Sequence, residues 1–450
     1  MHAWPDFVWS ALLIKLRTSL TISLATRRNA LNSSRFRAAV LIMVLLLQPG
    51  LLSAEDFDAW LQAFKPYARE QGISEQTLEQ AFVDAKPIER VVELDQSQPE
   101  FIQTFTTYLQ RRVTPKQISR GQQLQSEQGA LLQAVQARYG VPAQVLLAFW
   151  SLETNYGQSR GNFLVPHALA TLAYEGRRQA FFQSQLIDAL RIIDQGHIAA
   201  SDMLGSWAGA LGHMQFMPST FLAYAVDGDG DGKIDVWNST ADAMHSAGHY
   251  LQAMGWQASK PMMVEVVLPE NFAWQDTGLG NRHSVSAWMQ AGVSLAMPDA
   301  LPASFLAGND QAAVVLPQGW QGPAFMVFDN FNIIMKWNRS TLYALSVAHL
   351  ASRLAGGPAL QGGQLAEQEA VSIEAIKRLQ QQLTSLGFDT EGHDGLPGPK
   401  TQAAIRAYQL AHGLHADAYA SPSLIQEVAR AAALAQEQTE LIPGFPGTMP

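Results

Sequence analysis

The chain has 450 residues, of which 47% are hydrophobic and 15% are charged, and its formal net charge is −9. A chain of this length can bury a large core and is expected to form two or three domains. The acidic balance lacks the basic footprint of a nucleic-acid binder, so we expect no nucleic acid partner. Cysteine is absent, which excludes disulfides, a thiolate nucleophile and cysteine-ligated zinc.

A basic and then apolar segment near the N-terminus has the pattern of an export signal. Arg35 and Arg37 precede the apolar run AAVLIMVLLL at 38–47, and the small residues LSA end at Ala54. The run is shorter than the roughly 20 residues that span a membrane. We therefore favour a cleaved signal peptide over a membrane anchor, with residues 1–54 as an N-terminal extension that includes the signal. No cysteine is present to carry a lipid anchor.

Helical patterns dominate the chain after residue 55. Apolar residues recur every three or four positions across 56–85. The stretch 129–157 predicts two helices around a Gly-Val-Pro break, with Pro142 in the first turn of the second helix and Gly157 at its C-cap. Short strands are predicted within 262–269 and 312–331. These patterns indicate a mainly α chain of the α+β type, with a small β-containing part.

Composition divides the chain into further segments. We expect a catalytic domain at 55–355, a linker rich in glycine and small residues at 356–371, and a small helical domain at 372–430. The last segment, 431–450, is expected to be a flexible tail.

Glu153 is the notable residue of the apolar stretch FWSLETNYG at 149–157. Burying a carboxylate among aromatic residues is unfavourable unless the group is paired, neutral or functional. Apolar neighbours and the negative end of the helix dipole both favour the protonated form, which suits a proton donor. A structural ion pair with Arg160 is the alternative, and the nine residues alone do not decide between the two.

Five motifs occur in order along the chain: LETNYG, ALATLAYEGRR, SWAGALGHMQFMPST, AGHYLQAMGW and KWNRSTLYALSVAHL. With them, the segment from Phe57 to Leu354 resembles the lytic murein transglycosylase B family of Gram-negative bacteria. The resemblance implies a lysozyme-like, mainly helical catalytic domain and a periplasmic location. It also implies cleavage of the β-1,4 bond between N-acetylmuramic acid and N-acetylglucosamine without water, which leaves a 1,6-anhydro end.

The resemblance assigns roles to individual residues. Glu153 would be the single catalytic acid and base, whereas most hydrolytic glycosidases need two carboxylates. The substrate's N-acetyl group would assist as the nucleophile, and no cofactor would be required. Asp188, Asp194 and Asp202 could supply a second carboxylate but are expected to be surface charges. The expected substrate contacts are Tyr108, Arg177, Arg178, Ser206, Gln215, Tyr250, Asn338 and Tyr343. Trp337, next to Asn338, stands where the family usually has tyrosine.

The acidic loop DGDGDGKIDVWN at 227–238 matches the first nine positions of an EF-hand loop. Oxygen ligands at this spacing favour calcium, bound weakly because Asn238 replaces the usual glutamate unless Asp242 folds back to help. The alternative is a surface loop of glycine and aspartate. The expected ligands are Asp227, Asp229, Asp231, the Lys233 carbonyl, Asp235 and Asp242. In the resembled family such a site is structural.

The segment 372–430 resembles the type 1 peptidoglycan-binding domain through LQQQLTSLGF, DGLPGPKTQAAI and AYQLAHGL. The family usually has Asp-Gly after the last motif, and this chain has Asp417-Ala418. Such a module would hold the enzyme near its substrate. The alternative is a generic three-helix domain.

Three functions are compatible with these patterns. The first is an exported lytic transglycosylase whose partners are peptidoglycan glycan strands and, in addition, proteins of cell-wall synthesis or division. The second is a hydrolytic muramidase of the same fold, which would leave reducing ends. The third is a noncatalytic peptidoglycan-binding protein, in which Glu153 would be dispensable for turnover.

Overall fold

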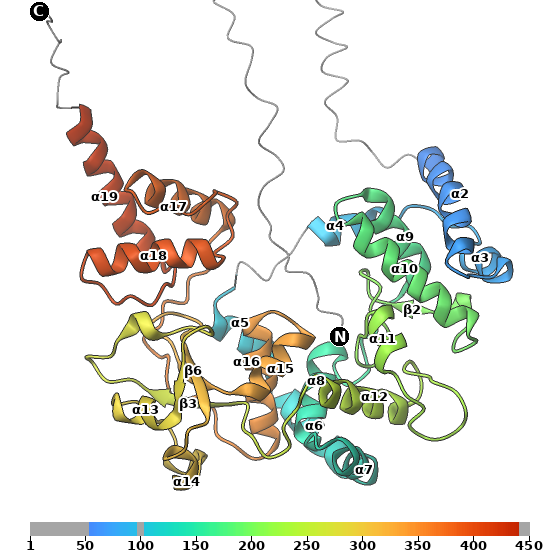
Figure 1. The fold of residues 1–450 in the computed structure, drawn as a ribbon, viewed down its shortest axis with the longest axis horizontal. Coiled ribbons are helices and arrows are strands. Elements are labelled where there is room, and N and C mark those ends of the chain that lie inside the picture. The colour runs from blue at the N-terminus through green and yellow to red at the C-terminus, as the bar shows by residue number, and fades with distance from the viewer. Residues whose placement is uncertain (1–53, 97–102, 441–450) are drawn as a thin grey trace, which may run out of the picture. The chain divides into compact units, whose positions relative to one another are not determined.

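The computed structural model describes residues 54–96 and 103–440 (Figure 1). The expected signal peptide and the last ten residues of the expected tail lie outside the described residues. The fold class is confirmed, because helices make up most of the described chain and the strands form one small part. No helix in the described ranges is long and apolar enough to cross a membrane.

The first part of the chain is helical. Its helices before Glu153 are α2 (Ala54–Glu70), α3 (Glu75–Ala81), α4 (Glu89–Gln96), α5 (Phe105–Arg112), α6 (Pro115–Glu127), α7 (Gly129–Tyr139) and α8 (Ala143–Thr154). Those after it are α9 (Val165–Glu175), α10 (Gln179–Asp194), α11 (Pro218–Tyr224) and α12 (Thr240–Ala253). A two-stranded antiparallel pair, β1 (Phe163–Leu164) and β2 (Leu204–Gly205), lies between them.

Helix α8 lies at the centre of the main hydrophobic core. Nearly every residue from Val145 to Leu152 is buried, so the helix is apolar on all faces, as expected for a central helix. It packs against α6, α7, α12 and α16 (Thr341–Leu354). Helix α6 begins with a capping box, in which Thr114 and Gln117 exchange side-chain and backbone hydrogen bonds.

A five-stranded antiparallel sheet forms a second core. Its order is β4-β6-β7-β3-β5, with β3 (Met263–Val267), β4 (Arg282–Ser284), β5 (Ser294–Leu295), β6 (Gln311–Val315) and β7 (Ala324–Val327). The short helices α13 (Val285–Gln290) and α14 (Ala303–Leu306) lie between strands in sequence. The predicted strands correspond to β3, β6 and β7, and are confirmed.

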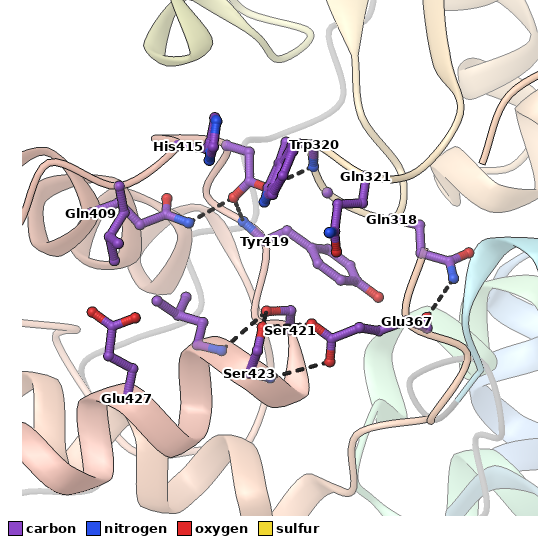
Figure 2. A pocket seen from close by; sticks show the side chains of 14 residues that line it. Gln318, Trp320, Gln321, Glu367, Gln409, His415, Tyr419, Ser421, Ser423 and Glu427 are labelled. Atoms are coloured by element: carbon purple, nitrogen blue, oxygen red, sulfur yellow. Dashed lines mark hydrogen bonds between the residues drawn. The ribbon is translucent and has the colours of Figure 1, made fainter. Parts of the chain in front are cut away.

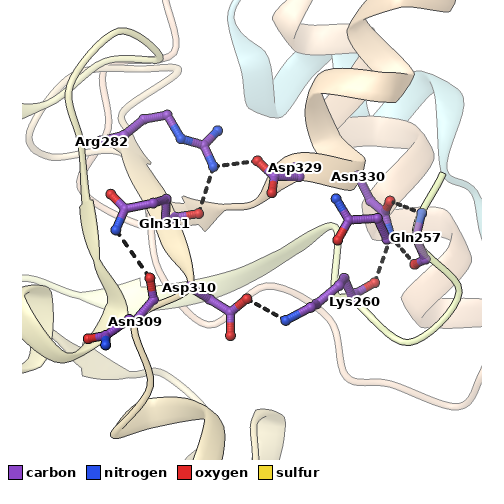
Figure 3. A network of polar contacts seen from close by, with 8 residues as sticks. All are labelled: Gln257, Lys260, Arg282, Asn309, Asp310, Gln311, Asp329 and Asn330. Atoms are coloured by element: carbon purple, nitrogen blue, oxygen red, sulfur yellow. Dashed lines mark hydrogen bonds and ion pairs between the residues drawn. The ribbon is translucent and has the colours of Figure 1, made fainter. Parts of the chain in front are cut away.

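A polar network connects this sheet region to α15 (Asp329–Trp337), the helix that precedes α16 (Figure 3). The buried amide of Asn330 donates to the backbone carbonyls of Gln257 and Lys260, each at 2.8 Å, and accepts from the Gln257 N–H at 2.9 Å. Ion pairs of Arg282 with Asp329 and of Lys260 with Asp310 flank it. These contacts fix the start of the helix that ends at Trp337.

The C-terminal module consists of α17 (Ile373–Ser385), α18 (Pro399–Ala411) and α19 (Pro422–Glu440), and it closes a separate hydrophobic core. The buried Gln380 side chain donates to Asp394 and Thr401 and accepts from the Gly395 N–H, which joins α17, the following loop and α18. Helix α19 continues to Glu440 and so includes the first ten residues of the segment expected to be a tail.

Candidate active site

Glu153 is the second-last residue of α8 and keeps intermediate exposure, whereas Leu152 and Thr154 beside it are buried. The C-cap of this helix is Asn155, with φ of 50°, and not Gly157 as expected from the sequence. An asparagine tolerates the left-handed conformation because its short polar side chain can bond locally. Gly157 has φ of 83°, and a Cβ there would lie 2.5 Å from the His213 ring, so close packing also requires a glycine.

Two donors converge on one oxygen of the Glu153 carboxyl group. The Tyr343 hydroxyl of α16 donates to Oε1 at 2.5 Å, and the Trp337 indole Nε1–H donates to the same Oε1 at 2.9 Å. No hydrogen bond within the described ranges goes to Oε2. The carboxyl group is therefore held through Oε1, and Oε2 is the oxygen left for other chemistry.

The environment raises the pKa of Glu153 to about 7. Burial is the largest cause, because a carboxylate loses its hydration there. The hydrogen bonds from Tyr343 and Trp337, and then the positive charge of Arg112, act in the opposite direction. Burial raises the pKa of Tyr343 well above its usual value, and the charge of the Glu153 carboxylate and the hydrogen bond to it act in the same direction, so the hydroxyl keeps its hydrogen.

Arg160 does not form the structural ion pair considered for Glu153. Its guanidinium donates to the Trp237 carbonyl and lies beside the His213 ring. The cation that acts on Glu153 is Arg112, at the end of α5, which also donates to the Leu152 carbonyl at 3.4 Å.

Aromatic rings surround the carboxyl group. The ring of Trp337 lies 4.4 Å from Phe149, 5.1 Å from Tyr250 and 5.3 Å from Phe216, measured between centroids. Burial raises the pKa of Tyr250 to about 12, so it stays neutral. Its hydroxyl lies 3.5 Å from the Lys336 carbonyl. These rings supply flat apolar surface, which suits the apolar faces of sugar rings.

The loop that carries Ser206 and Gln215 is attached to α8. The Trp150 indole donates to His213 Nδ1 at 3.0 Å, and the Thr154 hydroxyl donates to the His213 carbonyl at 2.7 Å. Ser206 accepts from the Ala210 N–H, which closes a tight turn. Gln215 has φ of 50°, a strained value for a residue other than glycine, and its amide donates to the Gly212 and Arg160 carbonyls.

Tyr108 and Asn338 are part of the framework around Glu153. Tyr108 is buried in α5, with the Arg112 guanidinium 5.3 Å from its ring centroid, and it acts on the pKa of Tyr343. Asn338 is the C-cap of α15, and its side-chain oxygen accepts from the Ser340 N–H at 3.0 Å. Ser340 in turn caps α16 by accepting from the Tyr343 N–H. Asn338 thus shapes the turn between the helices that carry Trp337 and Tyr343.

Arg177 and Arg178 lie together on the carboxylate of another residue, not on Glu153. Both pair with Asp95, whose side chain is only 2% exposed, while the arginine side chains are 47% and 34% exposed. Their structural role is to hold the end of α4 against the turn between α9 and α10. The geometry assigns no role to the other exposed N–H groups of these two arginines.

The acidic loop gathers three carboxylates. Oxygens of Asp227, Asp229 and Asp242 lie within 4.8 Å of one another. The Asp227 carboxylate accepts from the N–H groups of Gly232 and Gly230, which lower its pKa, and Asp242 accepts from those of Gly228 and Asp235. Asp231 and Asp235 are not in this group of three, and they too accept from neighbouring backbone N–H groups. Lys233 is exposed. Hard oxygen donors converging at this spacing fit a cation such as calcium.

A separate pocket of about 190 Å³ lies where the C-terminal module meets the loop around Trp320 (Figure 2). The Trp320 ring stacks on His415 with centroids 3.9 Å apart, and the backbone N–H of Trp320 donates to the Asp417 carboxyl group at 2.8 Å. Burial raises the pKa of the Asp417 carboxyl, which also accepts from Gln409. Glu367 of the linker accepts from Ser423. The pocket is thus lined by aromatic rings and acidic groups.

The comparison with protein families decides the class of this chain. A model described as the transglycosylase SLT domain matches residues 56–352, more than half of the chain. The chain belongs to the transglycosylase SLT family. A second model, the putative peptidoglycan binding domain, matches residues 372–427 of this transglycosylase.

Solved and curated relatives agree with this assignment. The transglycosylase is 42% identical to SltB3 of Pseudomonas aeruginosa, solved in complex with NAG-anhNAM-pentapeptide, with a TM-score of 0.80 over 83% of this chain and 99% of that one. It is 28% identical to Escherichia coli SLT35 in complex with calcium, with a TM-score of 0.57 over 66% and 92% of the two chains. It is 29% identical over 301 residues to membrane-bound lytic murein transglycosylase B of Escherichia coli strain K12, covering 63% of this chain and 79% of the relative. The enzyme class is therefore that of the lytic transglycosylases.

The contacts around Glu153 include residues to which the sequence assigned no such role. Trp337 stands where the resembled family usually has tyrosine, and its indole N–H donates to Glu153. Arg112 lies four residues after Tyr108, one helical turn away, so its place on the same face could have been predicted. No sequence pattern predicts the buried position of Asp95, because a lone aspartate in an amphipathic helix is typical of a surface charge.

Proposed function

We propose that this transglycosylase cleaves the β-1,4 bond between N-acetylmuramic acid and N-acetylglucosamine in peptidoglycan and leaves a 1,6-anhydromuramic end, with Glu153 as the single acid and base. The observation that supports this most is a carboxyl group whose pKa of about 7 leaves a large protonated fraction near neutral pH. Such a group can donate a proton to a leaving oxygen and later take one back.

The composition of the site favours one carboxyl group over two. Among the described residues, the groups that act on the pKa of Glu153 are Tyr343, Trp337 and Arg112, and none is a carboxylate. The three aspartates considered as a second carboxylate are engaged elsewhere: Asp188 with Arg191, Asp194 with Ser74 and Thr77, and Asp202 with Ser201. Most hydrolytic glycosidases need a second carboxylate at a defined distance.

The proposed reaction balances without water. The Glu153 carboxyl group gives its proton to the glycosidic oxygen as the bond to the anomeric carbon breaks, assisted by the substrate's own N-acetyl oxygen. The 6-hydroxyl of the same sugar then attacks the anomeric carbon, and the Glu153 carboxylate accepts that hydroxyl proton. Arg112 and the two donors to Oε1 stabilise the carboxylate between the two steps.

The remaining site residues have proposed contacts with the glycan. Tyr250 and the neighbouring aromatic rings would lie against sugar faces, and Ser206, Gln215 and Asn338 would bond to polar sugar groups. Tyr108 and Tyr343 would act at the carboxyl group, and Arg177 and Arg178 would reach substrate through donors that Asp95 leaves available. SltB3 has been solved with NAG-NAM-pentapeptide, which supports a peptidoglycan ligand for a relative 41% identical to this chain.

We also propose a structural calcium ion on Asp227, Asp229 and Asp242, with Asp231, the Lys233 carbonyl and Asp235 as the remaining candidates. When bound, the ion would neutralise carboxylates that otherwise repel one another. SLT35 solved with calcium supports this assignment. The ion would have no part in bond cleavage.

Export to the periplasm, with the signal within 1–54, completes the proposal, together with wall binding by the module at 372–430. The expected bounds of the catalytic domain (55–355), the linker (356–371) and the tail (431–450) stay predictions. So do protein partners from cell-wall synthesis or division.

The test is digestion of purified sacculi by the mature chain and by Glu153→Gln, followed by mass analysis of the muropeptides. We expect 1,6-anhydro products from the wild type and a loss of at least about 100-fold in the variant. Reducing ends would establish the hydrolytic muramidase instead. Undiminished digestion by Glu153→Gln would remove the role assigned to this residue.

A further inference from the structure

The two hydrogen-bond partners of Glu153 differ in whether they can accept as well as donate. Tyr343 reaches Oε1 through a hydroxyl, which can donate or accept. Trp337 reaches the same atom through an indole N–H, which can only donate. Of the two partners, the tryptophan is thus the one that cannot adapt if Oε1 carries a hydrogen.

A protonated carboxyl group has one carbonyl oxygen and one hydroxyl oxygen. If the hydrogen were on Oε1, Tyr343 could accept it, but the Trp337 indole N–H would still point at that atom, which would then be a hydroxyl oxygen. The hydroxyl oxygen is also the weaker acceptor of the two. If the hydrogen is on Oε2, Oε1 is a carbonyl oxygen that accepts both donors without conflict.

We propose that Trp337 is a positioning residue that confines the catalytic proton of Glu153 to Oε2, the oxygen that accepts no hydrogen bond from the described residues. A proton kept on one oxygen is always in place for transfer to the glycosidic oxygen. The consequence rests on the proposed function, but the position of the proton itself does not.

The surroundings keep the indole in the position that this role requires. Trp337 ends α15 between the rings of Phe149, Phe216 and Tyr250, which prevent the indole from turning away. The titratable groups that face the carboxyl group are Tyr343 from α16 and Arg112 from α5, with Tyr108 next to Tyr343 and Tyr250 next to Trp337. Burial raises the pKa values of Tyr343 and Tyr250, which keeps both neutral near pH 7, and Arg112 supplies the positive charge that faces the carboxyl group.

The first experiment compares the wild type with Trp337→Phe, which removes the N–H and keeps an aromatic ring. A donor lost from the carboxylate makes the ionised form less favourable, so the alkaline limb of the kcat profile should move up by about one pH unit. We expect kcat below pH 6 to fall a fewfold, because the proton can then occupy either oxygen, while KM changes less. An unchanged pH limb would overturn the proposal.

Two further variants separate positioning from packing. Replacing the Trp337 indole with the benzothienyl isostere, in which sulfur takes the place of the N–H, keeps the shape and removes only the donor. It should reproduce the shift in the pH limb, and a wild-type profile for it would overturn the proposal. Trp288→Phe is the matched control, because its indole N–H also donates to a buried acceptor, the Ala312 carbonyl, in the second core. It should leave the pH profile unchanged.

The proton can also be located without turnover. Neutron diffraction below pH 6 should show the exchangeable deuterium on Oε2 of Glu153 in the wild type, and deuterium on Oε1 would overturn the proposal. Infrared difference spectra against Glu153→Gln should place the carbonyl band of the wild type below that of Trp337→Phe, because Oε1 accepts two hydrogen bonds. These readouts hold even if Glu153→Gln were to digest sacculi normally, so failure of the proposed function and failure of this inference are distinguishable.

Discussion

The folded protein disfavours the ionised form of Glu153, and this has a consequence for stability as well as for chemistry. The pKa of Glu153 is about 7 in the folded chain against an ordinary value of 4.5. The folded chain therefore binds this proton more tightly than the unfolded chain. Its contribution to stability is fully present below about pH 4.5 and is lost as the pH rises through about 7.

Glu153→Gln should consequently stabilise the protein at alkaline pH. The amide cannot ionise, and its oxygen can accept from Tyr343 and Trp337 as the carboxyl Oε1 does. Because the pKa rises from 4.5 to about 7 on folding, we expect a gain of about 3 kcal/mol in the free energy of unfolding at pH 8 and little difference at pH 4. Urea unfolding at both pH values measures this. Glu79→Gln, at an exposed position of α3, should show no such pH-dependent gain.

At the residue scale, the sequence predicts the buried carboxyl group of Glu153 but not the residues that donate hydrogen bonds to it. The apolar stretch at 149–157 predicts a buried carboxyl group because local pattern is sufficient for that conclusion. Trp337 and Tyr343 lie 184 and 190 positions away along the chain, and no local pattern indicates that they donate to Glu153. Arg160, the nearby cation, points elsewhere because the Trp237 carbonyl and His213 engage it.

At the scale of elements, α15 depends on the amide of Asn330, which is fully buried. Asn330→Ala removes three hydrogen bonds with the backbone of Gln257 and Lys260 (Figure 3). We expect a loss of about 2–3 kcal/mol in the free energy of unfolding, measured in urea. Asn309→Ala, at an exposed position of the same region, should change stability by less than about 0.5 kcal/mol. Equal effects of the two variants would contradict a specific role for Asn330.

The acidic loop before α12 supports a second prediction at this scale. Three carboxylates within 4.8 Å repel one another, so calcium should raise the melting temperature of the wild type above its value in a chelator. Asp229→Asn should reduce that rise, because it removes one of the converging charges. Asp58→Asn, an exposed change of the same charge in α2, should retain the full rise. A wild-type melting temperature that does not respond to millimolar calcium would contradict an ion site.

The strands differ in how clearly their own sequences predict them. The strands β3, β6 and β7 have runs of apolar residues that predict strands, and they occupy the middle of the sheet. The edge strands β4 and β5 have three and two residues, and β4 reads Arg-His-Ser. Pairing with β6 and β3 makes them strands, so their own sequences contain almost no signal.

At the scale of the whole molecule, the hydrophobic cores are separate. The core of the C-terminal module contains only residues of α17, α18, α19 and the segments between and next to them. Its contacts with the rest of the chain include the packing of His415 against the rings of Trp320 and Trp274, together with polar contacts. Asp417 accepts from the Trp320 backbone N–H, and Arg406 donates to the Thr277 carbonyl at 3.1 Å. Ser423 donates to Glu367 (Figure 2). None of these contacts involves the helices that carry Glu153, Trp337 or Tyr343.

Ending the chain after residue 371 should therefore separate wall binding from bond cleavage. We expect the shortened enzyme to keep its kcat on a short soluble glycan within about twofold, because the Glu153 site and its core are unchanged. Its retention on sacculi should fall by at least about tenfold, since a tethered binding module raises the local concentration of its ligand. The full-length Glu153→Gln variant is the complementary control, which should bind sacculi as the wild type does and fail to cleave them. Equal retention of the full and shortened chains would show that the module at 372–430 does not hold the enzyme on the wall, whereas a loss of kcat on the short glycan would show that the module contributes to the active site itself.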